Sequence, residues 1–215
     1  MGRLFQNNGK MITKEYTIIE SFIREPWKAL TFKQVKNLSK NKSNNYVHTT
    51  LKKFVRDAIL IENKAGNVFL YSLAKNVFAL NTIGFIAEYK SNKAKHLPHK
   101  NIQKLLSKIK TPFYSFLIAG SYAKNKQKQS SDLDVVVVCD DAQRPKTILS
   151  QIKLESELMT PETHLYIFTK SEFLQMLLSK DENYGKEITR NNLIVTGAKQ
   201  FYNIIMEAIE NGFRG

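Results

Sequence analysis

The stretch FYSFLIAGSYAKNKQKQSSDLDVVVV, residues 113–138, decides the fold of the second half of the chain. It begins with an apolar run, 113–119, of the kind that forms a buried strand, and it ends with four consecutive valines, 135–138. Between these runs lie Gly120-Ser121, ten connecting residues and the triplet Asp132-Leu133-Asp134. Each part is common by chance, but strand, Gly-Ser turn, loop, Asp-x-Asp and apolar strand in this order form a specific constellation.

The two aspartates are the candidate metal ligands. Asp132 and Asp134 are two apart in a predicted strand, so both carboxylates should point to one face while Leu133 points to the core. Two neighbouring carboxylates raise each other's pKa unless a cation lies between them. Mg²⁺ and Mn²⁺ take oxygen ligands of this kind, so the pair predicts a divalent-metal site.

The Gly-Ser turn is the candidate phosphate site. A short helix predicted over 121–124 would present backbone N–H groups to an anion, and Gly120 and Ser121 are small enough for a phosphate to approach the backbone. Lys124, Lys126 and Lys128 add positive charge to the connecting loop. Gly120, Ser121 and Lys124 are therefore the predicted nucleotide-binding residues.

This constellation is similar to the signature of the nucleotidyltransferase superfamily of DNA polymerase beta, in particular its minimal and kanamycin-type members. The resemblance covers about residues 111–210. It implies an α/β fold with a small mixed sheet flanked by helices. It also implies that Gly120 and Ser121 bind the β- and γ-phosphates of an NTP while Asp132 and Asp134 hold the metal ions. The implied reaction is in-line attack of an acceptor hydroxyl on the α-phosphate, with pyrophosphate leaving, and metal ions assist both oxygens.

The chain departs from the family pattern at two places. The family has a third catalytic carboxylate on a later strand, whereas the strand predicted here over 163–168 contains no acid. Glu162 directly precedes that strand and is the candidate for the third catalytic acid, with His164 inside the strand as the alternative. Asn125 also stands where the family usually has a glycine.

Charge divides the chain into two modules. Residues 1–110 contain 21 Lys+Arg and 6 Asp+Glu, whereas residues 111–215 contain 12 and 13, so the whole net charge of +14 lies in the first half. Eight basic residues and no acid occur between Pro26 and Arg56. A polyanion is the natural partner of such a segment, and a solvated basic face is the alternative.

The first module has the pattern of three short helices followed by a hairpin. Apolar spacing predicts helices over 16–24, 32–39 and 44–58, with Thr31 and Ser43 as N-caps. Two strands, 59–62 and 68–73, flank a turn rich in Gly and Asn at 63–67. This arrangement resembles a winged helix-turn-helix domain with the third helix as recognition helix and the hairpin as wing.

The predicted recognition helix carries residue types that contact DNA. The face opposite its core holds five polar or basic residues: Asn45, Thr49, Lys52, Lys53 and Arg56. Such residues read base edges near a helix N-terminus and bind phosphates further along it. We therefore expect duplex DNA as the partner of residues 1–75, with protein docking as the alternative use of a winged helix.

Three divisions follow: a DNA-binding winged helix over 1–75, a basic and mostly helical connector over 76–110, and a nucleotidyltransferase-like domain over 111–215. In the connector, we expect Val77, Leu80, Ile83, Phe85 and Ile86 to pack together. The sequence has one cysteine, Cys139, which excludes an intramolecular disulfide framework, and no stretch approaches the roughly 20 apolar residues of a membrane span. A cytoplasmic protein is expected, and a homodimer is compatible with the sequence.

Three functions remain open at this stage. The first is an active Mg²⁺-dependent nucleotidyltransferase, and the second is a DNA-binding regulator whose transferase fold only senses nucleotide or a partner. The third is a structural adaptor that uses both modules for protein contacts. The presence of both Asp132 and Asp134 favours the first two, and we favour the first.

Overall fold

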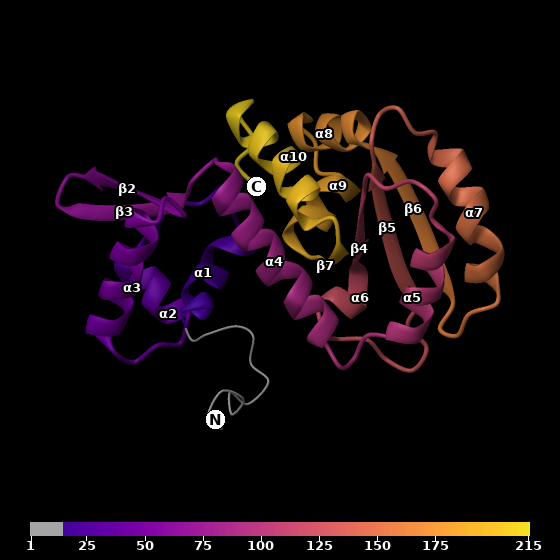
Figure 1. The fold of residues 1–215 in the computed structure, drawn as a ribbon, viewed down its shortest axis with the longest axis horizontal. Coiled ribbons are helices and arrows are strands. Elements are labelled where there is room, and N and C mark those ends of the chain that lie inside the picture. Colours follow the sequence, from indigo (N-terminus) through magenta and orange to yellow (C-terminus); the bar gives the residue numbers. More distant parts are fainter. Residues whose placement is uncertain (1–14) are drawn as a thin grey trace, which may run out of the picture.

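A computed structural model describes residues 15–215 (Figure 1). Its helices are α1 (Tyr16–Ile23), α2 (Phe32–Leu38), α3 (Asn44–Arg56), α4 (Val77–Lys93), α5 (His99–Lys108), α6 (Gly120–Ala123), α7 (Pro145–Glu157), α8 (Lys170–Leu178), α9 (Tyr184–Arg190) and α10 (Ala198–Glu210). Its strands are β1 (Leu30–Thr31), β2 (Leu60–Ala65), β3 (Val68–Leu73), β4 (Tyr114–Ile118), β5 (Leu133–Cys139), β6 (Thr163–Thr169) and β7 (Leu193–Thr196). The predicted mixed α/β fold is confirmed.

The N-terminal unit, which we define as α1 to β3, has helix ends that its sequence specifies. The side chain of Thr31 accepts from the Gln34 backbone while the Gln34 side chain accepts from the Thr31 backbone, which is a capping box at the start of α2. The Ser43 hydroxyl accepts from the backbone N–H of Tyr46 at 3.2 Å and begins α3. Both predicted caps are thus confirmed, because cap chemistry depends only on neighbouring residues.

The hairpin and the end of α3 differ from the predicted bounds. Helix α3 ends at Arg56, two residues early, because Ala58 has the left-handed φ of 55° and cannot continue a helix. Strand β2 runs on to Ala65, so the turn contains only Gly66 and Asn67. The three strands of this unit pair antiparallel in the order β1-β3-β2.

Helix α4, which begins the predicted connector, packs against both parts of the molecule. It lies between the N-terminal unit and the larger sheet, in contact with α1, β7 and α10 (Figure 1). Leu80, Ile83 and Ile86 are buried as predicted. The prediction was wrong for Val77 and Phe85, which are 65% and 44% exposed. Their apolar spacing is helical, but they project from the side of α4 that faces solvent.

The larger sheet separates two apolar layers. Its order is β6-β5-β4-β7, with β5 and β6 parallel and β4 antiparallel to both β5 and β7. Residues of one face, including Phe116 and Val135, pack with apolar residues of α5 and α7. Residues of the other face, including Leu117 and Val136, belong to a core that also contains residues of α4, α8 and α10. Both layers draw on the same apolar runs, because successive residues of a strand point to opposite faces of the sheet.

The C-terminal end of the chain returns to the N-terminal unit. Phe213 is buried, and its ring meets the ring of Trp27 edge-on at a centroid distance of 5.3 Å. One apolar core therefore includes residues from α1, α3, α4 and α10.

Candidate active site

The candidate active site comprises Gly120, Asp132, Asp134 and His164, and it begins where β4 ends. Gly120 starts α6 with a φ of +61°. A Cβ atom added to Gly120 would lie 2.0 Å from Oδ2 of Asp134, where a van der Waals contact needs at least 3.4 Å. The turn therefore requires glycine for two reasons: the left-handed backbone and the carboxylate that lies against its Cα.

Asp134 is partly buried next to Gly120. It is the second residue of β5, and its side chain is 24% exposed, while Leu133 before it is fully buried in the core as predicted. Burial raises the pKa of Asp134, and the carboxylates of Asp132 and Glu187 act in the same direction, whereas His164 opposes them. Asp132 lies just before the strand, close enough to Asp134 to affect its ionisation.

His164 occupies the strand position next to Asp134. The parallel register of β5 and β6 pairs these two residues, and Nδ1 of His164 lies 3.7 Å from Oδ1 of Asp134. Nε2 of the same ring lies 3.7 Å from Oε1 of Glu162, whose side chain is 77% exposed. His164 thus stands between Asp134 and the predicted third acid, Glu162.

The carboxylates of the site suit Mg²⁺ only if oxygen atoms of a bound substrate complete its coordination. Within residues 15–215 no group of three or more His, Cys, Asp or Glu side chains is placed to hold a metal ion. Mg²⁺, however, is commonly bound by one or two carboxylates together with phosphate oxygens and waters. Asp132 and Asp134 provide two such carboxylates, and within residues 15–215 the carboxylate of Asp134 has His164 as its ion-pair partner and no lysine or arginine within 4.0 Å.

The loop after α6 carries the predicted phosphate-binding lysine. Nζ of Lys124 lies 3.3 Å from Oε1 of Glu187 on α9, so the lysine has an intramolecular partner in this structure. Sequence reasoning missed Glu187, which is 63 residues away in the chain. It also missed Tyr184, whose ring lies 4.6 Å from that of Tyr166 and whose pKa is raised by burial and by Asp134. No local pattern marks these residues.

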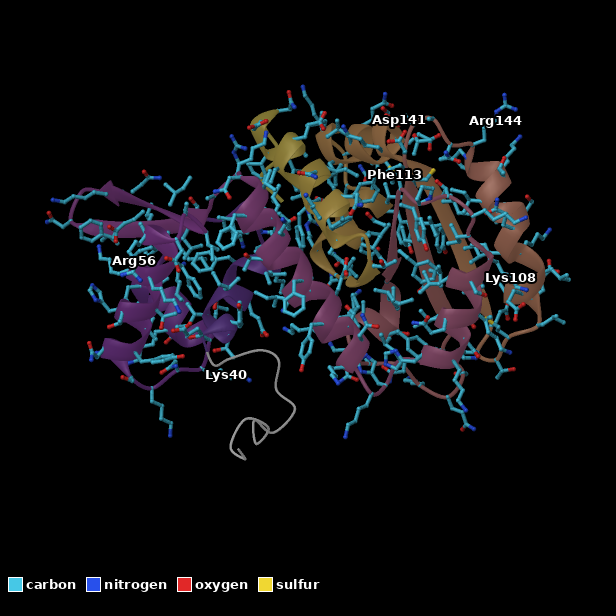
Figure 2. All side chains as sticks on the ribbon, viewed as in Figure 1. Lys40, Arg56, Lys108, Phe113, Asp141 and Arg144 are labelled. Atoms are coloured by element: carbon cyan, nitrogen blue, oxygen red, sulfur yellow. The ribbon has the colours of Figure 1, made fainter. Side chains whose placement is uncertain are left out.

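The predicted recognition surface is exposed along α3. Asn45, Thr49, Lys52 and Arg56 are all exposed, and so is His48 between them. Arg56, labelled in Figure 2, has a side chain that is 75% exposed and lies 3.6 Å from Asp57.

The two lysines of this helix have partners that their spacing in the sequence did not reveal. Nζ of Lys52 lies 2.8 Å from both carboxylate oxygens of Glu62 on β2, and 5.3 Å from the ring centroid of Phe69. Nζ of Lys53 lies 2.6 Å from Oε2 of Glu15, and this hydrogen bond raises the pKa of Lys53. The pKa of Glu62 is lowered, chiefly by its hydrogen bond from Lys52.

One family model matches the central region of the chain. Residues 100–188 match the model of the nucleotidyltransferase domain. This nucleotidyltransferase region contains all four residues of the candidate active site as well as Ser121, Lys124 and Glu162.

The other comparisons add little. One solved structure, described as "Crystal structure of the toxin-antitoxin with AMP-PNP", is 17% identical, with a TM-score of 0.37; the similarity covers 54% of this chain and 86% of that one. No curated protein matches. Among the helices of residues 15–215, none has the length and apolar character needed to cross a bilayer.

Proposed function

We propose that this protein transfers a nucleotidyl group from an NTP to the hydroxyl of an acceptor, using Asp132 and Asp134 to hold a divalent metal ion. The observation that carries the proposal is the packing of Gly120 against the Asp134 carboxylate inside the nucleotidyltransferase region. This contact brings the phosphate-binding turn and the metal-binding strand together. The NTP phosphates and the hydroxyl of the acceptor would then be held next to each other.

Each residue of the site has a role that follows from its position. Gly120 and Ser121 at the end of β4 would receive the NTP phosphates, and Lys124 would exchange its Glu187 partner for a phosphate oxygen. A metal ion bound by the aspartates supplies electrostatic stabilisation of the attacking and leaving oxygens.

Glu162 and His164 are proposed as a pair. The side chain of Glu162 is exposed, and its Oε1 atom lies 3.7 Å from Nε2 of His164. The carboxylate of Glu162 therefore contacts the opposite ring nitrogen from the one that faces Asp134. We propose that Glu162 supplies the third acid, and that His164 positions Asp134 through the contact between β5 and β6.

Labelled substrate provides the test. The full chain is incubated with each α-labelled NTP and Mg²⁺, with and without cell extract, beside the Asp132→Asn/Asp134→Asn variant. Label in an acceptor with the wild type but not with the variant is the expected result. Nucleotide binding without any labelled acceptor would instead favour a regulator that only senses nucleotide.

We further propose that the N-terminal unit is a winged helix that binds duplex DNA through α3. The order helix, strand, two helices and hairpin supports this proposal, as does the exposed polar face of α3. Counterion release predicts affinity that falls steeply as salt increases. Asn45→Ala should flatten the preference among sequences, whereas Arg56→Ala should weaken binding to all of them. Failure of the full chain to shift any duplex at low salt would favour protein docking.

A further inference from the structure

Three aromatic side chains follow one another along the outer side of α4. Phe78, Phe85 and Tyr89 are seven and four residues apart, and a helix places such residues on one face, which we call the α4 stripe. Phe78 is 59% exposed, Phe85 is 44% exposed, and Tyr89 is partly exposed. Single exposed apolar residues are common on proteins, but three rings on one face of one helix form a surface that a partner can use.

Positive charge continues the α4 stripe at the end of the helix. The rings of Phe85 and Tyr89 lie 6.0 Å apart at their centroids, and Nζ of Lys93 lies 5.8 Å from the centroid of the Tyr89 ring. The loop that follows then contacts α6, because Nε2 of His96 lies 2.9 Å from the carbonyl oxygen of Tyr122. Figure 1 shows this end of α4 beside α6. Rings along the helix thus lead to a cation at its end.

The segment that begins in this stripe contains lysines and no acid. Residues 89–131 include no Asp, Glu or Arg and ten lysines: Lys90, Lys93, Lys95, Lys100, Lys104, Lys108, Lys110, Lys124, Lys126 and Lys128. All of these lysines are exposed. Among residues 15–215, Lys93 and Lys95 at the end of the stripe have no carboxylate within 4.0 Å. A chain of phosphates complements charge of this kind.

We infer that the α4 stripe, with Lys93 and Lys95 at its end, binds single-stranded nucleic acid. Unpaired bases stack on exposed aromatic rings while lysines bind the phosphates between them. The bases of a duplex already stack on one another, so these rings favour a single strand. From Phe78 to Lys93 the stripe is about 22 Å long, enough for several successive nucleotides at about 3.4 Å or more each.

This surface is separate from the two sites proposed above. Phe78 and Phe85 belong to α4, whereas the proposed duplex-binding residues belong to α3 and the candidate active site begins at α6. Strand binding through the stripe needs neither an NTP nor a metal ion. The inference can therefore fail while nucleotidyl transfer holds, and the reverse is equally true.

Binding of labelled single strands tests the inference. Fluorescent oligouridylate, oligothymidylate and a duplex of equal length are each titrated with the full chain in the presence of EDTA, and fluorescence anisotropy is recorded. We expect at least one of the two single strands to bind, with affinity that falls as salt increases. Comparison of the two strands shows whether RNA or DNA is preferred. Failure of both single strands to bind at low salt would overturn the inference.

Replacement of the rings locates that binding. Phe78→Ala/Phe85→Ala should weaken binding of the single strand at least about 10-fold, because each ring loses a stacked base. Any duplex binding and the melting temperature should stay unchanged, since both rings are exposed. The control Leu154→Ala/Leu158→Ala removes two side chains of α7 and its end that are 70% and 77% exposed, and should not affect strand binding. Equal strand affinity of these two variants would overturn the inference and favour a second copy of the chain as the partner of the stripe.

Replacement of the lysines tests the contact with phosphates. Lys93→Ala/Lys95→Ala should reduce the slope of log affinity against log salt by about 1.4, since each phosphate contact of a single strand contributes about 0.7. Lys146→Ala/Lys180→Ala removes the same charge from exposed positions outside residues 89–131 and should leave the slope unchanged. An equal slope for these two variants would show that the strand does not reach the end of α4, contrary to the inference.

Discussion

Replacement of Gly120 by alanine tests the geometry of the candidate active site most directly. The left-handed backbone of residue 120 destabilises any residue with a Cβ by about 1–2 kcal/mol. The new methyl group would also lie 2.0 Å from Oδ2 of Asp134, so the carboxylate must move by about 1.4 Å to reach the ordinary 3.4 Å. Overpacking of this kind costs about 1–3 kcal/mol. We therefore expect Gly120→Ala to lower the free energy of unfolding by about 2–5 kcal/mol in urea denaturation.

A second glycine separates the two contributions. Gly66, in the hairpin turn, has a φ of +59°, but no atom lies within 4 Å of the position that a Cβ would take there, so Gly66→Ala should show the backbone contribution alone. In an Asp134→Ala background the carboxylate is absent, and Gly120→Ala should then cost no more than Gly66→Ala. The resulting coupling energy of about 1–3 kcal/mol is measured by a double-mutant cycle.

Two results would refute this reasoning. One is an equal effect of Gly120→Ala and Gly66→Ala on stability. The other is a Gly120→Ala penalty that does not change when Asp134 is truncated. The displaced carboxylate should also weaken the stabilisation that Mg²⁺ and NTP together give to the folded state, which a thermal-shift titration measures.

Four further predictions concern charge. Burial raises the pKa of Asp134, so ionisation of this carboxyl group opposes folding. Without metal, the Asp134→Asn variant should therefore have a higher free energy of unfolding than the wild type at pH 7. This difference should vanish below the ordinary pKa of about 4, and a series of urea denaturations at different pH values measures it. Glu162→Gln should abolish transfer with little loss of NTP binding, and full activity would exclude Glu162 as the third acid. Arg56→Ala should reduce the salt slope of DNA binding by about 1, whereas Lys52→Ala should change it less because Glu62 already binds that ammonium. Glu62→Gln should free Lys52 and tighten DNA binding, and unchanged affinity in a filter-binding assay would show that Lys52 does not contact phosphate.

Local chemistry made much of the fold predictable from sequence. The caps Thr31 and Ser43, the apolar strands on either side of the Gly-Ser turn, and the burial of Leu133 depend on neighbouring residues or on strand alternation. The approximate bounds of most helices follow from the same signals. The contact between Gly120 and Asp134 joins the Gly-Ser turn to the Asp-x-Asp triplet, which are the two parts of the sequence pattern that predicted the site.

Contacts between distant segments were not predictable. The register that pairs Asp134 with His164 depends on how β6 joins the sheet, and the pairing of Lys52 with Glu62 depends on how the hairpin lies against α3. Val77 met the helical spacing of a core residue, yet it is exposed because no other element of residues 15–215 covers that side of α4. In each case the presence or absence of a contact with a distant segment decides the outcome, and the spacing of residues along the chain does not reveal such contacts.

The placement of α4 also bears on how the molecule unfolds. Its buried side chains share one apolar core with α1 and α10, so a cut between residues 75 and 76 would expose Ile18, Ile83 and Phe201 to water. The core that the two pieces share would then be open in both, although the apolar layer between the larger sheet, α5 and α7 lies wholly within the second piece. Heating should therefore melt the N-terminal unit and the larger sheet in a single calorimetric transition, and recombination that exchanges the N-terminal unit for an unrelated one would have to carry α4 along with it.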